Sequence, residues 1–339
     1  MSAKPVNLGS GPHRINRQRR LAYHAYGLAI VSDVEIPELP PLRDLRDQGR
    51  DRVHLRILGP RRAIEEPAQW LNASIYADGT PWLSTAKIES GYLLRFPQLA
   101  DFTIDAAGHD ITYVEAADGV NVVTLRHLAI DHVMPRVLNL LGIESLHATA
   151  VAASGGAVAF IGDAGAGKST LAASFHLNGL ESFCDDCLVL RQDGGRIMAT
   201  PAYPGVRLWD DSFKALMSES DRGLPVAQYT SKTRLLGDAA SFHADRLPLA
   251  RIYLLERPSR NDDTGVAPTI VRVSATEAFP LLIGASFPLY LTDHAMLTRH
   301  FRFITRVAAS VPIRRLTIPS DFSALPAVRS AVIADLDAT

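Results

Sequence analysis

Residues 157–186 read AVAFIGDAGAGKSTLAASFHLNGLESFCDD, and this stretch decides the fold of the second half of the chain. Five apolar residues, 157–161, predict a buried strand, and a glycine-rich loop follows over residues 162–167. Residues 168–178 predict a helix, and residues 180–185 predict a second strand. A strand, a loop, a helix and a strand in this order are typical of an α/β unit.

The loop has the spacing of a phosphate-binding P-loop, with Gly162 at its start and Gly167, Lys168 and Ser169 at its end. Its glycines let backbone N–H groups turn inward around phosphate oxygens, and the next helix points its positive end at the same anion. Lys168 can reach the β and γ phosphates, and the Ser169 hydroxyl can coordinate magnesium. We therefore expect ATP and Mg²⁺ as cofactors; the alternative is a glycine-rich turn without a ligand. The expected nucleotide-binding residues of this segment are Gly162, Asp163, Ala164, Gly165, Ala166, Gly167, Lys168, Ser169 and Thr170.

Two adjacent carboxylates, Asp185 and Asp186, end the second predicted strand. Because the carboxyl ends of neighbouring parallel strands meet at one crevice, a carboxylate there can face the γ-phosphate. Side chains alternate along a strand, so we expect only one of the two to do so. Holding magnesium and accepting a proton from an attacking hydroxyl are both open roles, and a solvated turn is the alternative. His147 precedes the first strand and is a further candidate, although a lone histidine is more often structural.

The N-terminal third has a different pattern, with short alternating segments and turn residues between them. We expect strands over residues 28–31, 53–58, 74–77, 92–96, 102–105 and 111–114. Residues 122–141 then have apolar side chains at helical spacing, with a kink expected at Pro135. The expected fold class is mixed α/β. It comprises a basic disordered tail (1–20), a β-rich N-terminal domain ending in a helix (21–143) and a P-loop catalytic domain (144–339). Within the catalytic domain, further strands are expected at 251–255 and 312–318, and helices at 276–283, 296–309 and 323–336.

Composition excludes several classes of protein. The 339 residues carry 35 Lys and Arg against 36 Asp and Glu, a net charge of -1, which gives no global field to attract nucleic acid or anionic membrane. No apolar run is long enough to cross a membrane. The two cysteines, Cys184 and Cys187, are too few for a disulfide scaffold and fit a reducing compartment, so the cytoplasm is the expected location. We interpret this pair as small strand residues, with no second pair to complete a zinc site.

The segment from His147 to about Leu190 resembles the catalytic domain of HPr kinase/phosphorylase. In that family a histidine precedes the first strand, the loop reads Gly-Asp-Ser/Ala-Gly-x-Gly-Lys-Ser, and an Asp-Asp pair follows one helix later. The resemblance implies an ATP-dependent kinase that phosphorylates a serine hydroxyl of a peptide or protein. It implies that Asp186 is the base, with Asp185 as second choice, that His147 assists, and that Asp185 and Ser169 hold the metal. The HPr enzymes form rings, so the resemblance also leaves a homo-oligomer as an option.

The chain departs from the HPr enzymes in two places. Thr170 stands where they usually have a metal-binding Glu, and the N-terminal strands do not look like their regulatory domain. The whole chain is more similar to the HPr-kinase-related proteins of bacteria, on segments 26–30, 37–40, 204–209 and 232–236. Some members of that group act beside lasso-peptide biosynthesis genes and phosphorylate the terminal serine of the precursor peptide.

Three basic residues follow the α/β unit. Lys232 and Arg234 lie in a polar stretch and are expected either on a mobile loop that closes on the phosphates or on an ordinary solvated loop. Arg207 lies between turn residues and Trp209, where packing of its aliphatic stem is the expected role.

Three functions remain open at this point. The first is the serine kinase. The second is an ATPase or GTPase without a phosphoacceptor, in which Glu256 follows an apolar strand as the acidic element. The third is a nucleotide-binding sensor without turnover. The three functions differ in the carboxylate on which activity depends. The kinase needs Asp185 or Asp186, the ATPase needs Glu256, and the sensor needs none of them.

Overall fold

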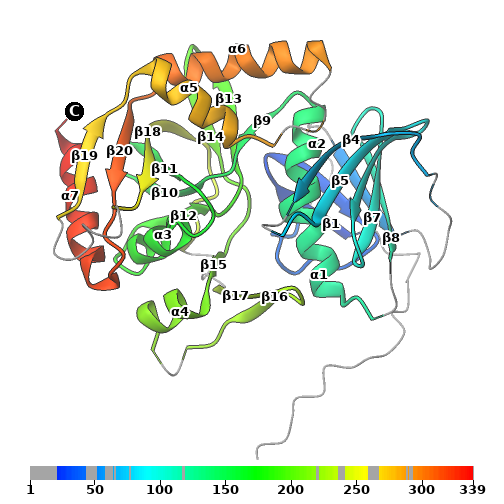
Figure 1. Ribbon diagram of the computed structural model, residues 1–339. Coiled ribbons are helices and arrows are strands. Elements are labelled where there is room, and N and C mark those ends of the chain that lie inside the picture. The colour runs from blue at the N-terminus through cyan, green and yellow to red at the C-terminus, as the bar shows by residue number, and fades with distance from the viewer. Residues whose placement is uncertain are drawn as a thin grey trace, which may run out of the picture.

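A computed structural model describes residues 21–42, 52–57, 64, 66–75, 78–116, 119–218, 221–235, 241–258, 267–287, 289 and 293–338 (Figure 1). The expected basic tail over residues 1–20 lies outside these residues, as do Leu58 and Ala77 at the ends of two expected strands. The described chain is mixed α/β, with an eight-stranded sheet in its N-terminal part and a nine-stranded and a three-stranded sheet in its C-terminal part.

The N-terminal sheet has the strand order β1-β2-β3-β8-β7-β6-β5-β4. Its strands are β1 (Leu21–Ala25), β2 (Leu28–Ser32), β3 (Arg52–Ile57), β4 (Trp70–Ile75), β5 (Pro81–Ile88), β6 (Gly91–Phe96), β7 (Ala100–Asp105) and β8 (Asp110–Glu115). Neighbours pair antiparallel except for β3, which runs parallel to both β2 and β8. The sequence did not predict β1 or β5.

A helical rod joins the two halves of the molecule and lies between them (Figure 1). It consists of α1 (Val122–His127), a π-helical segment η1 (Leu128–Val133) and α2 (Met134–Leu140). The Asn121 side chain caps its start by accepting a hydrogen bond from the Thr124 N–H. Pro135 has no N–H to donate to the carbonyl four residues back, and at the expected kink the helix widens into η1.

The large C-terminal sheet is centred on β18 (Leu247–Glu256). Its order is β12-β10-β11-β18-β14-β13-β9, and β20 pairs with both β18 and β19. The other strands of this sheet are β9 (Glu144–Leu146), β10 (Thr149–Ala153), β11 (Gly156–Ile161), β12 (Glu181–Cys184), β13 (Leu188–Asp193), β14 (Arg196–Thr200), β19 (Thr269–Arg272) and β20 (Ile313–Thr317). β11 runs parallel to β18, and β10 lies between β11 and β12, antiparallel to both. β11 and β12 therefore point the same way, as expected, but they are not neighbours.

Helices and a small sheet complete the C-terminal part. The helices are α3 (Lys168–His176), α4 (Asp210–Leu216), α5 (Ala275–Gly284), α6 (His294–Ser310), a 3-10 turn η3 (Phe322–Ala324) and α7 (Leu325–Asp337). The small sheet consists of β15 (Val206–Leu208), β17 (Thr230–Leu235) and β16 (Leu224–Ala227), in that order. The prediction of a loop around Lys232 is therefore wrong, because this segment forms the central strand of the small sheet.

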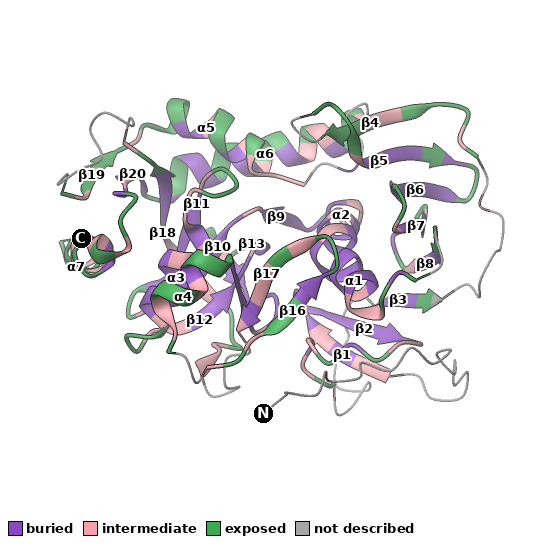
Figure 2. Ribbon diagram, turned by 60° about the horizontal axis from the view of Figure 1, so that its bottom comes forward, coloured by how far each residue is buried: buried purple, intermediate pink, exposed green. Residues whose placement is uncertain are grey.

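One hydrophobic core runs through both halves. It includes Phe96 and Phe102 of the N-terminal sheet, Leu128 of the rod and Ile252 of β18, all of which are fully buried. Figure 2 shows buried residues along the rod and along the central strands of the large sheet. Since apolar burial is the main favourable term in folding, this shared core holds the rod in a fixed place beside the C-terminal strands.

Candidate functional site

The glycine-rich loop leaves the end of β11 and enters α3, as the sequence predicts. Gly165 and Gly167 have φ angles of 82° and 98°, a left-handed conformation that glycine adopts without a steric cost. A Cβ atom at Gly162 would lie 3.1 Å from the carbonyl oxygen of Leu255, so the start of the loop is also tightly enclosed. The spacing of the three glycines therefore corresponds to three positions at which a side chain would be strained or crowded.

The Lys168 side chain folds back over the loop. Its Nζ atom donates to the carbonyl oxygens of Gly162 and Asp163 at 2.8 and 3.2 Å. Burial lowers the pKa of Lys168, while the carboxylates of Asp186 and Asp185 oppose that shift. The ammonium group is thus held over the loop by weak carbonyl acceptors, which a phosphate oxygen can replace with a stronger, charged one.

Asp185 is buried, and both of its carboxylate oxygens accept hydrogen bonds. Its Oδ1 accepts from the hydroxyls of Thr149 and Ser169, both at 2.8 Å, and its Oδ2 accepts from the backbone N–H of Arg207 at 2.8 Å. Burial and the neighbouring Asp186 raise the pKa of Asp185. The structure therefore brings together Ser169 and Asp185, the two residues expected to hold magnesium.

Asp186 lines a large cavity, whereas Asp185 is not among the residues that line it. Its backbone is left-handed, with φ of 63°, a conformation that Asp tolerates better than most residues. Its Oδ1 lies 3.7 Å from Nε2 of His147, and its Oδ2 lies 3.4 Å from Nε of Arg207. Although burial alone would raise the pKa of Asp186, Arg207, His147 and nearby Lys232 lower it well below its usual range. Of the two acids, Asp186 is the one that faces the cavity as a carboxylate.

Arg207 is fully buried, and its guanidinium joins the two halves of the site. Its Nη1 donates to both carboxylate oxygens of Asp131 at 2.8 and 2.9 Å, and its Nη2 donates to the carbonyl oxygen of Asp185 at 2.7 Å. The expectation that the Arg207 stem packs against neighbours is wrong, because its head group forms ion pairs at the base of the site. No local pattern around Arg207 indicates this role, since Asp131 lies 76 residues away.

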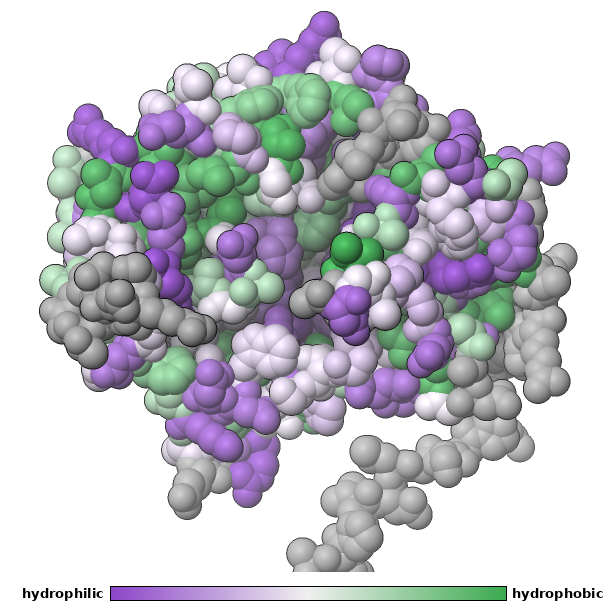
Figure 3. Space-filling view, in the orientation of Figure 1, coloured by the Kyte–Doolittle hydropathy of each residue, from purple (hydrophilic) through white to green (hydrophobic). Residues whose placement is uncertain are grey.

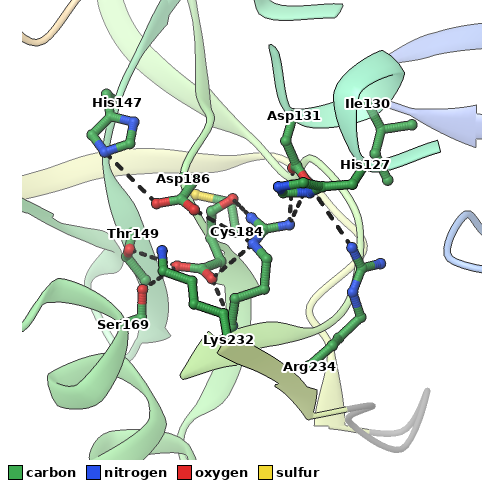
Figure 4. A network of polar contacts seen from close by, with 12 residues as sticks. His127, Ile130, Asp131, His147, Thr149, Ser169, Cys184, Asp186, Lys232 and Arg234 are labelled. Atoms are coloured by element: carbon green, nitrogen blue, oxygen red, sulfur yellow. Dashed lines mark hydrogen bonds and ion pairs between the residues drawn. The ribbon is translucent and has the colours of Figure 1, made fainter. Parts of the chain in front are cut away.

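Asp131 lies in η1 of the rod, and sequence reasoning missed it (Figure 4). Besides Arg207, it contacts Nδ1 of His127 at 2.5 Å, the hydroxyl of Tyr203, and Nη2 of Arg234 at 3.9 Å. Burial alone would raise the pKa of Asp131, but the surrounding cations, led by Arg207, lower it far below its usual range. A carboxylate from the N-terminal part thus completes the buried charge network of the C-terminal part.

Lys232 and Arg234 lie on the same strand, β17, but only Lys232 lines the cavity. The Lys232 ammonium lies 5.2 Å from the centre of the Trp209 ring. The Arg234 guanidinium is buried toward Asp131 and lies 5.7 Å from the Tyr203 ring. The structure therefore separates the two residues that the sequence grouped together.

The cavity has a volume of about 820 Å³ and lies between the two halves of the molecule, where Figure 3 shows the surface hollowed. One end is formed by the glycine loop, Arg257, Ser320 and Phe322. Arg257 was not predicted; it directly follows β18, donates to the carbonyl oxygen of Pro319 at 3.1 Å and lies close to Gly167. The other end is lined by residues of the rod and of neighbouring segments: Ile75, Trp82, His127, Asp131, His132, Arg136, Tyr229 and Phe287.

Four other residues that the sequence analysis singled out lie in and around the site. Thr170 lines the cavity, and its hydroxyl donates to the Ser212 hydroxyl at 2.9 Å. Glu256 is half exposed, pairs with Arg315 at 2.8 Å and is not among the residues that line the cavity. Cys184 and Cys187 are both buried free thiols, and burial raises the pKa of each. Cys184 ends β12, as expected, but Cys187 lies between β12 and β13, so the expectation of a strand residue is wrong there.

The described residues contain no group of three or more His, Cys, Asp or Glu side chains placed to bind a metal. Mg²⁺, however, is commonly held by one or two protein oxygens together with water and the phosphates of the substrate. The oxygens of Ser169 and Asp185 fit that pattern. No helix in the described segments is both long and apolar enough to cross a membrane.

His132 gives the fold a testable response to acid. Burial lowers the pKa of His132 well below its usual value; His127 and Arg136 add to this shift, whereas Asp131 and Asp186 oppose it. A histidine in the unfolded chain binds a proton near pH 6.5, so between pH 6.5 and 5 the unfolded state holds more protons than the folded one. The free energy of unfolding should therefore fall as the pH falls through this window.

Replacing His132 with Gln should flatten this decline, by up to roughly 1.4 kcal/mol per pH unit. The measurement is urea unfolding at several pH values between 5 and 7. His109→Gln, at an exposed position, is the control and should keep the wild-type slope. An unchanged slope in His132→Gln would show that this imidazole is not held neutral.

No model of a known protein family matches the chain, and no curated protein matches its sequence. Among solved structures, the chain is similar to the HPr(Ser) kinase/phosphatase from Coxiella burnetii, with 12% sequence identity and a TM-score of 0.32. The match covers 57% of this chain and 97% of that one. A likeness this distant gives no residue of the chain a role.

Proposed function

We propose that the protein is an ATP- and Mg²⁺-dependent kinase that transfers the γ-phosphoryl group to a serine hydroxyl of a peptide or protein. One observation carries the proposal. A single cavity brings together a glycine loop with its folded-back Lys168, the Ser169 hydroxyl and the Asp186 carboxylate. Phosphoryl transfer requires these three elements, since its catalysis consists mainly of positioning and charge neutralisation.

The loop end of the cavity would hold the nucleotide phosphates. Backbone N–H groups of the loop and the N-terminus of α3 favour an anion there, and Lys168, Lys232 and Arg257 supply positive charge around it. Ser169 and Asp185 would hold magnesium, which when bound neutralises charge on the β and γ phosphates. Phe322 would offer an apolar face for the adenine ring of the nucleotide.

In this proposal Asp186 would receive the proton of the attacking serine hydroxyl. It faces the cavity, and the Arg207 guanidinium keeps it ionised and fixes its position. A carboxylate with a low pKa is a weak base, but a largely dissociative transition state demands little proton abstraction before the phosphoryl group has moved. His147 borders the same carboxylate, and burial lowers the pKa of His147. The ribosomal precursor of a lasso peptide is one acceptor of the proposed class.

Ser169 offers a sharp test of this assignment. Ser169→Ala removes the hydroxyl that would hold magnesium, and we expect the rate of phosphoryl transfer at limiting Mg²⁺ to fall by roughly 100-fold. Ser169→Thr is the matched control, because it keeps the hydroxyl and should retain most of the activity. The assay follows label from γ-labelled ATP onto serine peptides across a Mg²⁺ titration. Equal activity of the Ala and Thr variants would contradict a metal-binding role.

A further inference from the structure

The N-terminal part supplies the cavity wall opposite the glycine loop. This wall, which we call the rod wall, consists of Trp82 from β5 and of His132 and Arg136 from the helical rod; Phe287 borders it from the C-terminal part. Neither the proposed nucleotide site nor the proposed catalytic base, Asp186, uses these residues. What the rod wall binds is therefore a separate question, and its answer rests on the proposed function.

Arg136 is a cation without an anionic partner in the described part of the chain. Its Nη1 donates to the carbonyl oxygen of His132 at 2.7 Å, one turn back along the rod, and no carboxylate of a described residue forms an ion pair with it. Burial lowers the pKa of Arg136 to about 10, so the side chain is charged at neutral pH. A partly desolvated guanidinium that faces a cavity favours an anionic ligand. Two of its N–H donors can bind the two oxygens of a carboxylate at the same time.

Aromatic rings connect this cation to the reacting groups. The guanidinium of Arg136 lies 6.0 Å from the centre of the Phe287 ring, and the same ring lies 5.7 Å from the ring of His147. His147 in turn borders Asp186. Phe287 thus links Arg136 to His147, on the side of the site where His147 contacts Asp186. Lys168, Lys232 and Arg257 line the cavity together with the glycine loop.

The remainder of the rod wall is apolar. The rings of Trp82 and His132 are in edge contact at 4.6 Å, and burial keeps His132 neutral, so this surface carries no charge of its own besides Arg136. Aromatic side chains of this kind bind apolar groups and contribute large contact areas.

From these contacts we propose that the rod wall is the acceptor subsite and that it takes a peptide segment with a carboxylate close to the acceptor serine. Arg136 binds the carboxylate, Trp82 and Phe287 contact an apolar neighbour, and the serine hydroxyl then lies toward Asp186. The carboxylate comes either from an acidic side chain or from the C-terminus of the peptide. The N-terminal part is accordingly a substrate-binding module in this account.

Phosphorylation of serine peptide libraries tests the proposal. One library has a central serine between randomised positions and an amidated C-terminus, a second has a C-terminal serine with a free carboxylate, and a third is the amide of the second. Labelled peptides are identified by mass spectrometry, and kcat and KM are then measured for the preferred peptide. The variants are Arg136→Gln and, as a matched helical control at an exposed position, Arg302→Gln.

We expect a strong preference for a carboxylate: either enrichment of Asp or Glu beside the serine, or labelling of the free acid over its amide. Arg136→Gln should raise KM for that peptide by roughly tenfold to hundredfold, the loss of one charge-assisted pair, with a smaller change in kcat. It should have little effect on peptides without the carboxylate. Arg302→Gln should match the wild type.

Two results would overturn the proposal in different ways. Labelling that is indifferent to carboxylates, or equal in Arg136→Gln and the wild type, rejects the acceptor subsite and leaves the kinase intact. Absence of label on every library, although the wild type binds ATP, rejects peptide phosphorylation and the subsite with it.

Discussion

Replacing Lys168 with alanine is expected to weaken ATP binding by more than about 100-fold and to leave the fold intact. The reason is local. Lys168 is buried, and its ammonium group is held over the loop by two backbone carbonyls, at 2.8 and 3.2 Å. In the free protein its removal costs two hydrogen bonds to uncharged carbonyl oxygens, whereas in the complex it costs a contact with a negatively charged phosphate oxygen.

Calorimetric titration with ATP and Mg²⁺ measures this effect, and circular dichroism checks the fold. Lys214→Ala, at an exposed position on α4, is the matched control and should bind ATP as the wild type does. Equal affinity in Lys168→Ala and the wild type would rule out the P-loop assignment.

Arg207→Met is expected to lower the free energy of unfolding by about 3–5 kcal/mol. Arg207 is 2% exposed and is bonded to Asp131 and to the Asp185 carbonyl, so the variant leaves the Asp131 carboxylate buried without its main cation. The loss should be largest above pH 4, where Asp131 would be ionised in the unfolded chain. Because Arg207 also keeps Asp186 ionised, phosphoryl transfer should fall even at temperatures where the variant stays folded.

Arg315→Met provides the comparison for this prediction. Arg315 pairs with Glu256 on the surface, and an exposed pair contributes about 1 kcal/mol or less. Urea unfolding of both variants should therefore separate them clearly. If Arg207→Met costs no more than Arg315→Met, the buried network does not hold the two halves of the site together. Loss of phosphoryl transfer in Arg315→Met would instead support the alternative in which Glu256 is the catalytic acid.

The segment from β11 to β12 could be read from the sequence because its signals are local. The apolar strand, the glycines of the loop and the helix each depend on neighbouring residues, and the structure places them within a few residues of the expected bounds. The expectation that Ser169 and Asp185 lie together came from the resemblance to HPr kinase/phosphorylase, and the Ser169 hydroxyl donates to Asp185 at 2.8 Å. Asp186 lines the cavity, whereas Asp185 does not and accepts a hydrogen bond from the Ser169 hydroxyl; which of the two faces the γ-phosphate stays a prediction.

The remainder of the site depends on contacts between distant segments. Asp131 has no motif, and only the fold brings it to Arg207. Lys232 and Arg234 lie in a polar stretch typical of a loop, but pairing with β15 and β16 makes that stretch a strand and turns Arg234 toward Asp131. The place of β10 between β11 and β12 was likewise not predictable, since strand pairing is set by tertiary packing and not by residue preferences.

The central claim, phosphoryl transfer to serine with Asp186 as the base, is tested most directly by following γ-labelled ATP with the wild type and with Asp186→Asn. Asparagine also tolerates the left-handed backbone at this position, so the variant removes the carboxylate without straining the turn. The account predicts label on peptide serine with the wild type and a loss of roughly 100- to 10,000-fold in the variant. Release of labelled phosphate that needs no peptide and survives Asp186→Asn would contradict it.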